Sequence, residues 1–277
     1  MILVRALKRL IIQLKLYLPI RFKSIQPNLI VSLTSYSKRL PSIHLVIRSI
    51  LHQSLQPEKI ILYLDSNTKE SDIPNKLKKL TKYNFEIKTG YQNLKPHTKY
   101  FYAMKENPNS EIITIDDDLI YDNKLIEDLY SNYQKYPNCI IARRVHLMTK
   151  SGDKINSYNN WKWEYTGELQ PSHSLIATGV GGVLYPHNIL PDETFDIENI
   201  QKYCLNTDDI WLKFMEIKND VKIVFTNSKV IHPLTIRKSQ DSGLLNTNTA
   251  GENRNDININ LMQDFTGINL ANYTESF

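Results

Sequence analysis

Three consecutive aspartates, Asp116, Asp117 and Asp118, are the side chains best placed to do chemistry. They follow the apolar run 111–115, which predicts a buried strand. Adjacent carboxylates repel one another, and a bound divalent cation offsets that repulsion. Hard oxygen ligands suit Mg²⁺ or Mn²⁺, with substrate phosphates completing the coordination shell. The triplet therefore favours a metal site, and a solvated acidic turn that caps the next helix is the alternative.

A glycine cluster forms the second motif, in the segment Thr178-Gly-Val-Gly-Gly-Val-Leu-Tyr-Pro186. Gly179, Gly181 and Gly182 are three of the nine glycines in the chain. Such clustering indicates a backbone that approaches a ligand closely, or a tight turn before a core strand. The spacing does not match a dinucleotide-binding fingerprint.

The third motif is Asn206-Thr-Asp-Asp209, at the start of an expected helix. Thr207 or Asp208 can cap that helix, and acidic side chains suit a helix N-terminus. Capping accounts for one carboxylate only. The other is a candidate general base, since a positioned carboxylate can take a proton from a hydroxyl.

Strands that alternate with helices must position these motifs. The expected strands are residues 28–34, 59–65, 85–88, 111–115, 139–142, 180–185, 221–226 and 229–232, and the expected helices are residues 41–55, 73–81, 97–106, 123–136 and 208–217. This alternation predicts a single Rossmann-like α/β fold with a mostly parallel, doubly wound sheet. Ligands of such sheets lie beyond the carboxyl ends of the strands, where Asp65 and the aspartate triplet fall.

At these motifs the chain resembles the glycosyltransferases of the A-type fold, the nucleotide-diphospho-sugar transferases. The aspartate triplet resembles their Asp-X-Asp motif. The glycine-rich segment followed by Asp208 and Asp209 resembles the Gly-Gly and Glu-Asp pairing of inverting, galactosyltransferase-like members. The ordered combination covers about residues 28–235 and is more specific than any motif alone.

The resemblance implies a role for each matched position. Thr34, Ser35 and Asp65 would meet the nucleoside, Asp116 would approach the ribose, and Asp118 would bind the metal. Asp209 matches the catalytic base, and His232 matches a further metal ligand of some members. The remaining expected ligand contacts are Lys95 and Lys99 to the diphosphate, with Asp117, Asp208, Gly181 and Gly182 around the donor. The pair is Asp-Asp where many relatives have Glu-Asp, which leaves the role of Asp208 open.

The resemblance also sets the expected reaction. A sugar would move from a nucleotide-diphosphate donor, expected to be a UDP-sugar, to a hydroxyl of a carbohydrate or lipid-linked acceptor in bacterial surface polysaccharide synthesis. Trp161, Trp163 and Tyr165 are expected to stack on acceptor sugars or to be packed inside the protein. A retaining transferase on the same fold, a sugar nucleotidyltransferase and a non-catalytic carbohydrate-binding protein are the alternatives.

Composition agrees with a globular protein of one domain, with 41% apolar and 23% charged residues in 277. A net charge of +5 does not indicate a nucleic-acid partner. Cys139 and Cys204 form no disulfide framework, which fits the cytoplasm. We expect a donor half at 28–150 and an acceptor half at 151–238 within a domain over 24–238, followed by an Asn-rich lid or tail over 239–277.

Residues 1–23 predict a basic amphipathic helix. They contain six lysines and arginines and no acid. The apolar side holds Leu3, Val4, Leu7, Leu10, Ile11, Leu14 and Leu18, whereas Ile12 and Leu16 fall on the other side. Interrupting charges argue against a spanning helix or a cleavable signal. The absence of acids favours binding to the inner face of an anionic membrane, and packing on the protein itself or on a second subunit is the alternative.

Overall fold

The computed structural model describes residues 12, 14–20, 24–167, 171–226, 234–236 and 253–275. Its centre is one large sheet with the strand order β12-β6-β11-β4-β1-β2-β3. The strands are β1 (Ile25–Thr34), β2 (Gln56–Asp65), β3 (Phe85–Tyr91), β4 (Glu111–Thr114), β6 (Ile140–Ala142), β11 (Val183–Tyr185) and β12 (Ile223–Phe225). The predicted mostly parallel α/β sheet is confirmed.

One strand runs against the others. β11 pairs antiparallel with β4 on one side and with β6 on the other, whereas the other neighbouring pairs of the sheet are parallel. β11 thereby separates two parallel groups and places the glycine cluster that precedes it beside the end of β4. Sequence spacing gives no information on this strand order.

Alternating side chains of the strands build two helix-covered faces. Leu29, Val31 and Leu33 point to one face, where they join the core under α2 (Leu40–Leu51) and α5 (Leu125–Lys135). Ile30 and Ile61 point to the other face and meet α4 (Thr98–Glu106). Further along that second face, the β11 and β12 side chains pack under α7 (Asp208–Lys218). Since both faces of these strands are covered, their sequences are nearly continuous apolar runs.

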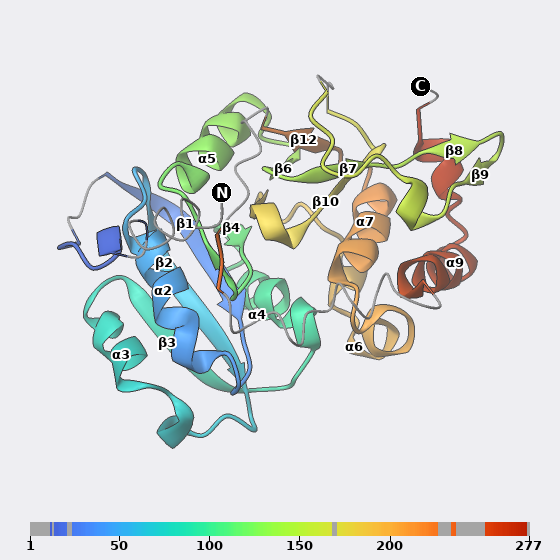
Figure 1. The fold of residues 1–277 in the computed structure, drawn as a ribbon. Coiled ribbons are helices and arrows are strands. Elements are labelled where there is room, and N and C mark those ends of the chain that lie inside the picture. Colours follow the sequence, from blue (N-terminus) through green and yellow to red (C-terminus); the bar gives the residue numbers. More distant parts are fainter. Residues whose placement is uncertain are drawn as a thin grey trace, which may run out of the picture.

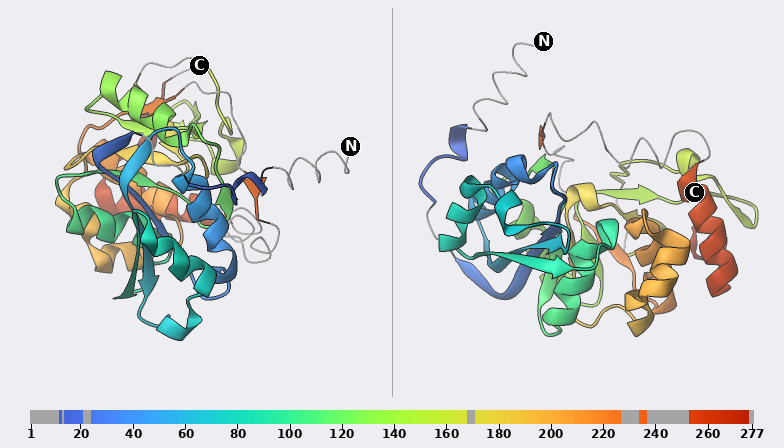
Figure 2. Two further views of the ribbon diagram at one scale, coloured as in Figure 1. Left: turned by 90° about the vertical axis from the view of Figure 1, so that its left-hand side faces the viewer. Right: turned by 90° about the horizontal axis from the view of Figure 1, so that it is seen from below.

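The remaining elements are small two-stranded sheets and short helices. Two-stranded sheets form between β7 (Val145–Leu147) and β10 (Leu175–Ala177), β5 (Leu119–Ile120) and β13 (Leu234–Thr235), and β8 (Lys150–Ser151) and β9 (Lys154–Ile155). The short helices are α3 (Asn75–Lys78) and α6 (Ile197–Asn199). Both ribbon views place α3 and β3 at one end of the molecule and α7 and α9 toward the other (Figures 1 and 2).

The described part of the C-terminal segment differs from the expected lid or tail. Residues Arg254–Thr266 form the helix α9, which ends at Gly267 in the left-handed conformation. Ile259 and Met262 are buried in the same core as α7. The polar composition concealed this helix, because two of its buried positions are asparagines, Asn255 and Asn258.

The N-terminal segment is described only at residue 12 and over 14–20. Ile12 and Leu16 pack against the core under α2, and the carbonyl of Leu16 accepts hydrogen bonds from Arg48 and His52. Leu14 and Leu18 are 60% and 58% exposed. The two residues on the minor side of the predicted helix therefore dock on the protein, and the two described residues of the leucine-rich side, Leu14 and Leu18, are exposed. Among the described residues, no helix is long and apolar enough to cross a membrane.

Candidate active site

The aspartate triplet lies directly beyond the carboxyl end of β4. The chain leaves the sheet at Thr114 and pairs again as β5 with β13, and Ile236 donates a backbone hydrogen bond to the carbonyl of Asp118. The three side chains meet different partners. Asp117 is buried, whereas Asp116 and Asp118 keep partial exposure. Of the three, Asp116 and Asp118 therefore have the more accessible carboxylates.

Asp117 anchors the loop to the end of β1. Its Oδ2 accepts a hydrogen bond of 2.6 Å from Ser35 Oγ, and its Oδ1 is bound by the guanidinium of Arg39. Both oxygens are thus engaged by protein groups. Ser35, which was expected at the nucleoside, instead fixes the aspartate loop together with Arg39.

Asp118 carries poorly compensated negative charge. Burial and the neighbouring Asp116 raise the pKa of Asp118 to about 6, although Arg39 Nη1 lies 3.3 Å from its Oδ2. A divalent cation would offset this repulsion, and Mg²⁺ or Mn²⁺ is typically held by one or two carboxylates plus substrate phosphates. Asp116 and Asp118 fit that donor set. No group of three or more His, Cys, Asp or Glu side chains in the described part of the chain forms a complete metal cage.

Lys99 connects the triplet to the start of α7. Its Nζ lies 2.9 Å from Asp116 Oδ1 and 3.0 Å from Asp208 Oδ2, and its side chain is 7% exposed. Burial alone would lower the pKa of Lys99, but the two carboxylates outweigh it and raise that pKa well above its usual value. The sequence motifs at 116–118 and 206–209 therefore meet in one site through a buried cation.

Asp208 and Asp209 begin α7, and neither is its cap. Thr207 occupies the N-cap position, and its Oγ1 accepts a hydrogen bond from Asn258 of α9. Burial would raise the pKa of Asp208, yet Lys99 holds it below the usual value. Burial and the charge of Asp208 raise the pKa of Asp209 well above its usual value. The pKa values of the two neighbouring acids are therefore shifted in opposite directions.

Of the three clustered glycines, Gly179 is the one at the site. A Cβ on Gly179 would lie 2.6 Å from Lys99 Nζ and 2.9 Å from Asp116 Oδ1. A Cβ on Gly181 would instead meet the backbone of Arg144, and Gly182 has a φ of +82° beside Leu125. Gly181 and Gly182, which were expected around the donor, have packing and backbone reasons to lack a side chain.

The other expected donor contacts lie around this centre. Thr34 Oγ1 donates to the carbonyl of Tyr63, and Asp65 accepts hydrogen bonds from Thr68 and Asn93. Asp65 ends β2, two strands from β4, which corresponds to ~10 Å across the sheet. Lys95 is exposed, before α4. His232 lies outside the described residues.

Two arginines at the site, Arg39 and Arg144, were not predicted from the sequence. Arg39 follows β1, and Arg144 follows β6, so both stand just beyond the carboxyl end of a strand. Arg144 donates to Glu164 at 3.0 and 3.1 Å and to Thr178 Oγ1 at 3.0 Å. Its charge lowers the pKa of Asp209 against the effect of burial. The rule that ligands lie at strand ends was the available signal for both.

Aromatic residues line the neighbourhood of Arg144. Trp163 stacks on His146 with 5.0 Å between ring centroids, and its indole N–H donates to the carbonyl of Tyr158. Trp163 is 38% exposed, whereas Trp161 is 4% exposed. The negative charge of Asp209 contributes, after burial, to raising the pKa of Tyr158. Of the two tryptophans, Trp163 presents an accessible surface, and Trp161 is packed inside.

No family model matches the chain, and no curated protein matches it. Two solved structures with a related fold are CMP:2-keto-3-deoxy-manno-octonic acid synthetase complexed with CTP and apo UDP-glucose pyrophosphorylase. Each is 10% identical to this chain with a TM-score of 0.41, over 73% of this chain and 88% and 89% of theirs. A likeness at this level describes a shared α/β arrangement and does not determine an activity.

Proposed function

We propose that the protein is a metal-dependent glycosyltransferase that moves a sugar from a nucleotide-diphosphate donor to a hydroxyl acceptor with inversion. The observation that carries the proposal is the split acid pair at the start of α7, beside the aspartates that follow β4. Two carboxylates whose environments drive their pKa values apart are suited to different tasks. Asp208 stays charged against Lys99, and Asp209 is free to accept a proton.

In this reaction the acceptor hydroxyl oxygen attacks the anomeric carbon of the donor sugar. The bond from that carbon to the diphosphate breaks, and the nucleoside diphosphate leaves with the electron pair. Asp209 takes the hydroxyl proton as the new glycosidic bond forms. A raised pKa suits this step, because general bases work best when their pKa lies near the operating pH. An oxocarbenium-like transition state is expected, as in glycoside hydrolysis.

The donor diphosphate needs positive charge as it leaves. Asp116 and Asp118 would hold Mn²⁺ or Mg²⁺, which would stabilise the developing charge on the leaving phosphate. Asp117, Ser35 and Arg39 keep the loop in place through the contacts described above. A UDP-sugar is the proposed donor, and the nucleoside would extend from Asp116 toward Thr34 and Asp65 along the strand ends.

The acceptor would lie on the side of Arg144 and Trp163. A rigid, partly exposed indole beside polar groups is suited to the apolar face of a sugar ring. The indole of Trp163 is fixed by stacking on His146 and by its hydrogen bond to Tyr158. A carbohydrate or lipid-linked acceptor is therefore suited to the surface beside Arg144 and Trp163.

A thermal-shift panel of nucleotide sugars with and without Mn²⁺ tests the donor assignment, because a ligand that binds the native state raises its apparent stability. Positive donors are then incubated with sugar acceptors, and the product anomer is read by NMR. We expect metal-dependent stabilisation and an inverted product. A product that keeps the anomeric configuration of the donor would indicate a retaining transferase. If no nucleotide sugar stabilises the protein, a non-catalytic carbohydrate-binding protein is favoured.

A sugar nucleotidyltransferase is the second candidate, since both related structures are named for enzymes that make activated sugars. Such an enzyme would need free cationic groups after the first strand to bind a triphosphate. Of the two basic residues that follow this strand, Arg39 is paired with Asp117 and Asp118, and Lys38 is the exposed one. Supplying pyrophosphate with UDP-sugar separates the two reactions: a nucleotidyltransferase forms UTP and a sugar 1-phosphate, whereas the proposed transferase releases UDP to an acceptor.

We also propose that the N-terminal segment binds an anionic membrane surface. Docking of Ile12 and Leu16 on the core leaves Leu14 and Leu18 exposed next to Lys15, in a stretch whose first 23 residues contain no acid. Exposed leucines and basic side chains together favour the headgroup region of anionic lipid. A cytoplasmic protein with a lipid-linked acceptor would gain access to its substrate in this way.

Vesicle sedimentation tests the membrane proposal without unfolding the N-terminal contact. The paired change Leu14→Ser with Leu18→Ser should lower binding to vesicles that contain phosphatidylglycerol. Ile257→Ser removes a comparably exposed apolar side chain on α9 and serves as the matched control. Unchanged binding by the double variant, or loss of a dimer in its place, would contradict the membrane assignment.

A further inference from the structure

Lys99 is enclosed by the acids that it joins. Asp116 comes from the end of β4 and Asp208 from the start of α7, and both lie within 3.0 Å of the same nitrogen. The backbone of Lys99 is also fixed, because Ser32 Oγ of β1 donates to its carbonyl at 2.5 Å. A lysine that binds a diphosphate must present its ammonium to the ligand. This ammonium is instead covered by two carboxylates and by Gly179.

We infer that Lys99 is a positioning residue that pins the metal-binding loop to the acid pair of α7, rather than a ligand of the donor diphosphate. The inference rests on the proposed function. We call the contacts of Lys99 with Asp116 and Asp208 the pin. The pin would fix the distance between the proposed metal-binding aspartates and the proposed base, Asp209. Displacements of about 1 Å in such a geometry can cost on the order of a hundredfold in rate.

A second contact from the same segment supports the pin. His97 Nε2 donates to the carbonyl of Cys204 at 2.8 Å, and its Nδ1 accepts from the hydroxyl of Tyr100 at 2.9 Å. His97 therefore holds the loop that leads into α7, two residues before Lys99 holds Asp208. The start of α4 is thus tied to the start of α7 at two points.

Gly179 leaves the space in which the pin lies. A Cβ at this position would come within 2.6 Å of Lys99 Nζ. It would also lie 2.9 Å from Asp116 Oδ1. Both atoms are at the ends of side chains, so Gly179→Ala should push the ammonium and the Asp116 carboxylate apart. This substitution breaks the pin with Lys99 still present, and Lys99→Met breaks it by removing the charge.

A double-mutant cycle tests the pin without any substrate. Lys99→Met, Asp208→Asn and the double variant are unfolded in urea, and the losses of stability are compared. We expect the double variant to lose clearly less than the sum of the two single changes. Lys105→Met, on the exposed end of α4, replaces Lys99→Met in a control cycle and should be additive with Asp208→Asn. Additivity in the Lys99 cycle would overturn the pin whether or not the protein transfers sugar.

Kinetics then separate a pin from a donor ligand. In Lys99→Met, kcat should fall on the order of a hundredfold, while the KM for the donor changes less than about threefold. Lys99→Arg keeps the charge and should recover part of the kcat lost in Lys99→Met. A raised donor KM with an unchanged kcat would overturn the inference, since it is the result for a lysine that binds the diphosphate. If the wild-type protein transfers no sugar, the proposed function fails, and the double-mutant cycle still decides the pin.

Discussion

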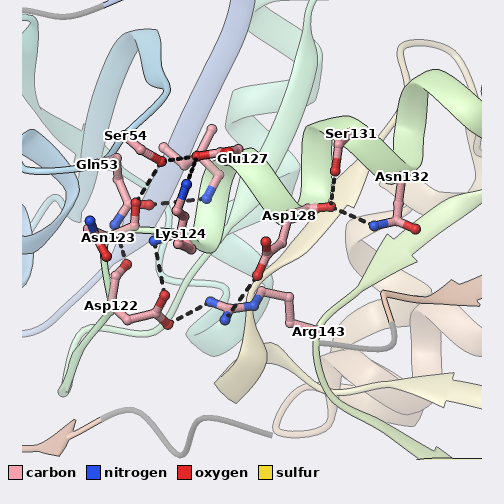
Figure 3. Close-up of polar contacts among 11 residues, drawn as sticks. Gln53, Ser54, Asp122, Asn123, Lys124, Glu127, Asp128, Ser131, Asn132 and Arg143 are labelled. Carbon is pink, nitrogen blue, oxygen red and sulfur yellow. Dashed lines mark hydrogen bonds and ion pairs between the residues drawn. The ribbon is translucent and has the colours of Figure 1, made fainter. Parts of the chain in front are cut away.

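Two buried cations in this molecule have nearly the same local geometry, and we propose different roles for them. Lys99 contacts Asp116 and Asp208 at 2.9 and 3.0 Å, and Arg143 contacts Asp122 and Asp128 at 2.8 and 3.2 Å. The side chains of Lys99 and Arg143 are 7% and 6% exposed. Figure 3 shows the Arg143 cluster at the base of α5. Burial and pairing alone therefore do not distinguish a functional cation from a structural one.

The surroundings of the two cations differ in their charge balance. In the Arg143 cluster, Asp122 and Asp128 share Arg143, and Glu127 accepts from Lys124 and Ser54 (Figure 3). Its acids also come from one short stretch, residues 122–128. Around Lys99 and Arg39, by contrast, two cations face five aspartates, Asp116, Asp117, Asp118, Asp208 and Asp209. Raised pKa values do not separate the two clusters, because burial also raises the pKa of Asp128 beside Arg143. The larger surplus of acids over cations supports the proposal that the Lys99 cluster is the one that binds a cationic ligand.

The largest expected effect is that of replacing Asp209, the proposed base. Asp209→Asn should lower the transfer rate roughly a hundredfold to ten-thousandfold, because the acceptor proton loses its base. Affinity for UDP with Mn²⁺, measured by calorimetry, should barely change. Asp220→Asn, at the far end of α7 with its side chain 93% exposed, is the matched control and should keep the wild-type rate. A near wild-type rate in Asp209→Asn would contradict the proposal that Asp209 is the base of an inverting transfer.

Arg143→Met should affect stability and not chemistry. Removing one partner of a fully buried ion pair costs about 3–5 kcal/mol. Asp122 and Asp128 keep 24% and 29% exposure, so their charges are partly solvated and we expect a loss of roughly 2 kcal/mol. Urea unfolding measures the loss, and kcat per folded molecule should remain unchanged. A fall in kcat as large as that expected for Lys99→Met would show that the Arg143 cluster also positions the site. The two buried cations would then not differ in role.

Asp118→Asn should remove the metal dependence of donor binding. The substitution keeps the shape of the side chain and removes the charge that burial and Asp116 make unfavourable. We expect Mn²⁺ to improve the affinity for UDP on the order of tenfold or more in the wild type, as a metal that bridges carboxylate and phosphate does. The variant should show no such gain in calorimetry. Unchanged Mn²⁺ dependence in the variant would exclude Asp118 as the ligand.

The pH profile of transfer should reveal the split acid pair. Asp209 acts as a base only when ionised, so kcat/KM should rise about tenfold per pH unit below its pKa and level off above it. Burial and the charge of Asp208 raise that pKa well above its usual range, so the inflection should lie above the range of ordinary carboxylates. Asp208→Asn removes the like charge and should move the inflection to lower pH. A profile that is flat through the acid range would contradict the assignment of Asp209.

The sequence was informative where local pattern determines structure. The apolar runs before Asp65 and Asp116 predicted β2 and β4, and the predicted helix at 208–217 appears as α7. Because parallel strands end at one edge of a sheet, the position of the aspartate triplet beyond β4 was predictable too. The meeting of this loop with α7 was implied only by the order of the motifs.

Features that depend on long-range packing were not predictable. The antiparallel insertion of β11 between β4 and β6 decides that Gly179, and not Gly181, lies against Lys99. Lys99 gave the same sequence signal as the exposed Lys95, because both are lysines near the start of one helix. Their difference arises from Asp208, which lies more than a hundred residues away. Pairing of Arg39 with Asp117 likewise required the folded arrangement.

A third pair of buried charged side chains has the smallest expected effect. Lys213 and Glu216, one turn apart on α7, are 1% and 2% exposed, with 3.3 Å between Nζ and Oε2. Burial raises the pKa of Glu216 to about 7 and lowers the pKa of Lys213, so burial disfavours the charged form of both groups. The pair has no surplus charge, which marks it as structural by the same criterion that singles out Lys99.

Replacing both partners by Lys213→Met and Glu216→Leu should therefore leave stability unchanged or raise it by about 1 kcal/mol, because the desolvation of two ions is removed. The single variant Lys213→Met leaves Glu216 without its cation, so its native carboxyl should hold a proton at neutral pH. The unfolded chain releases that proton above the usual glutamate pKa. The native state then binds more protons than the unfolded state, so stability must fall with rising pH. In the single variant this fall should begin near pH 4.5 and extend to pH 7 or above, and in the double variant it should be absent. Urea unfolding at a series of pH values measures both, and equal pH slopes in the two variants would show that Glu216 does not titrate inside the fold.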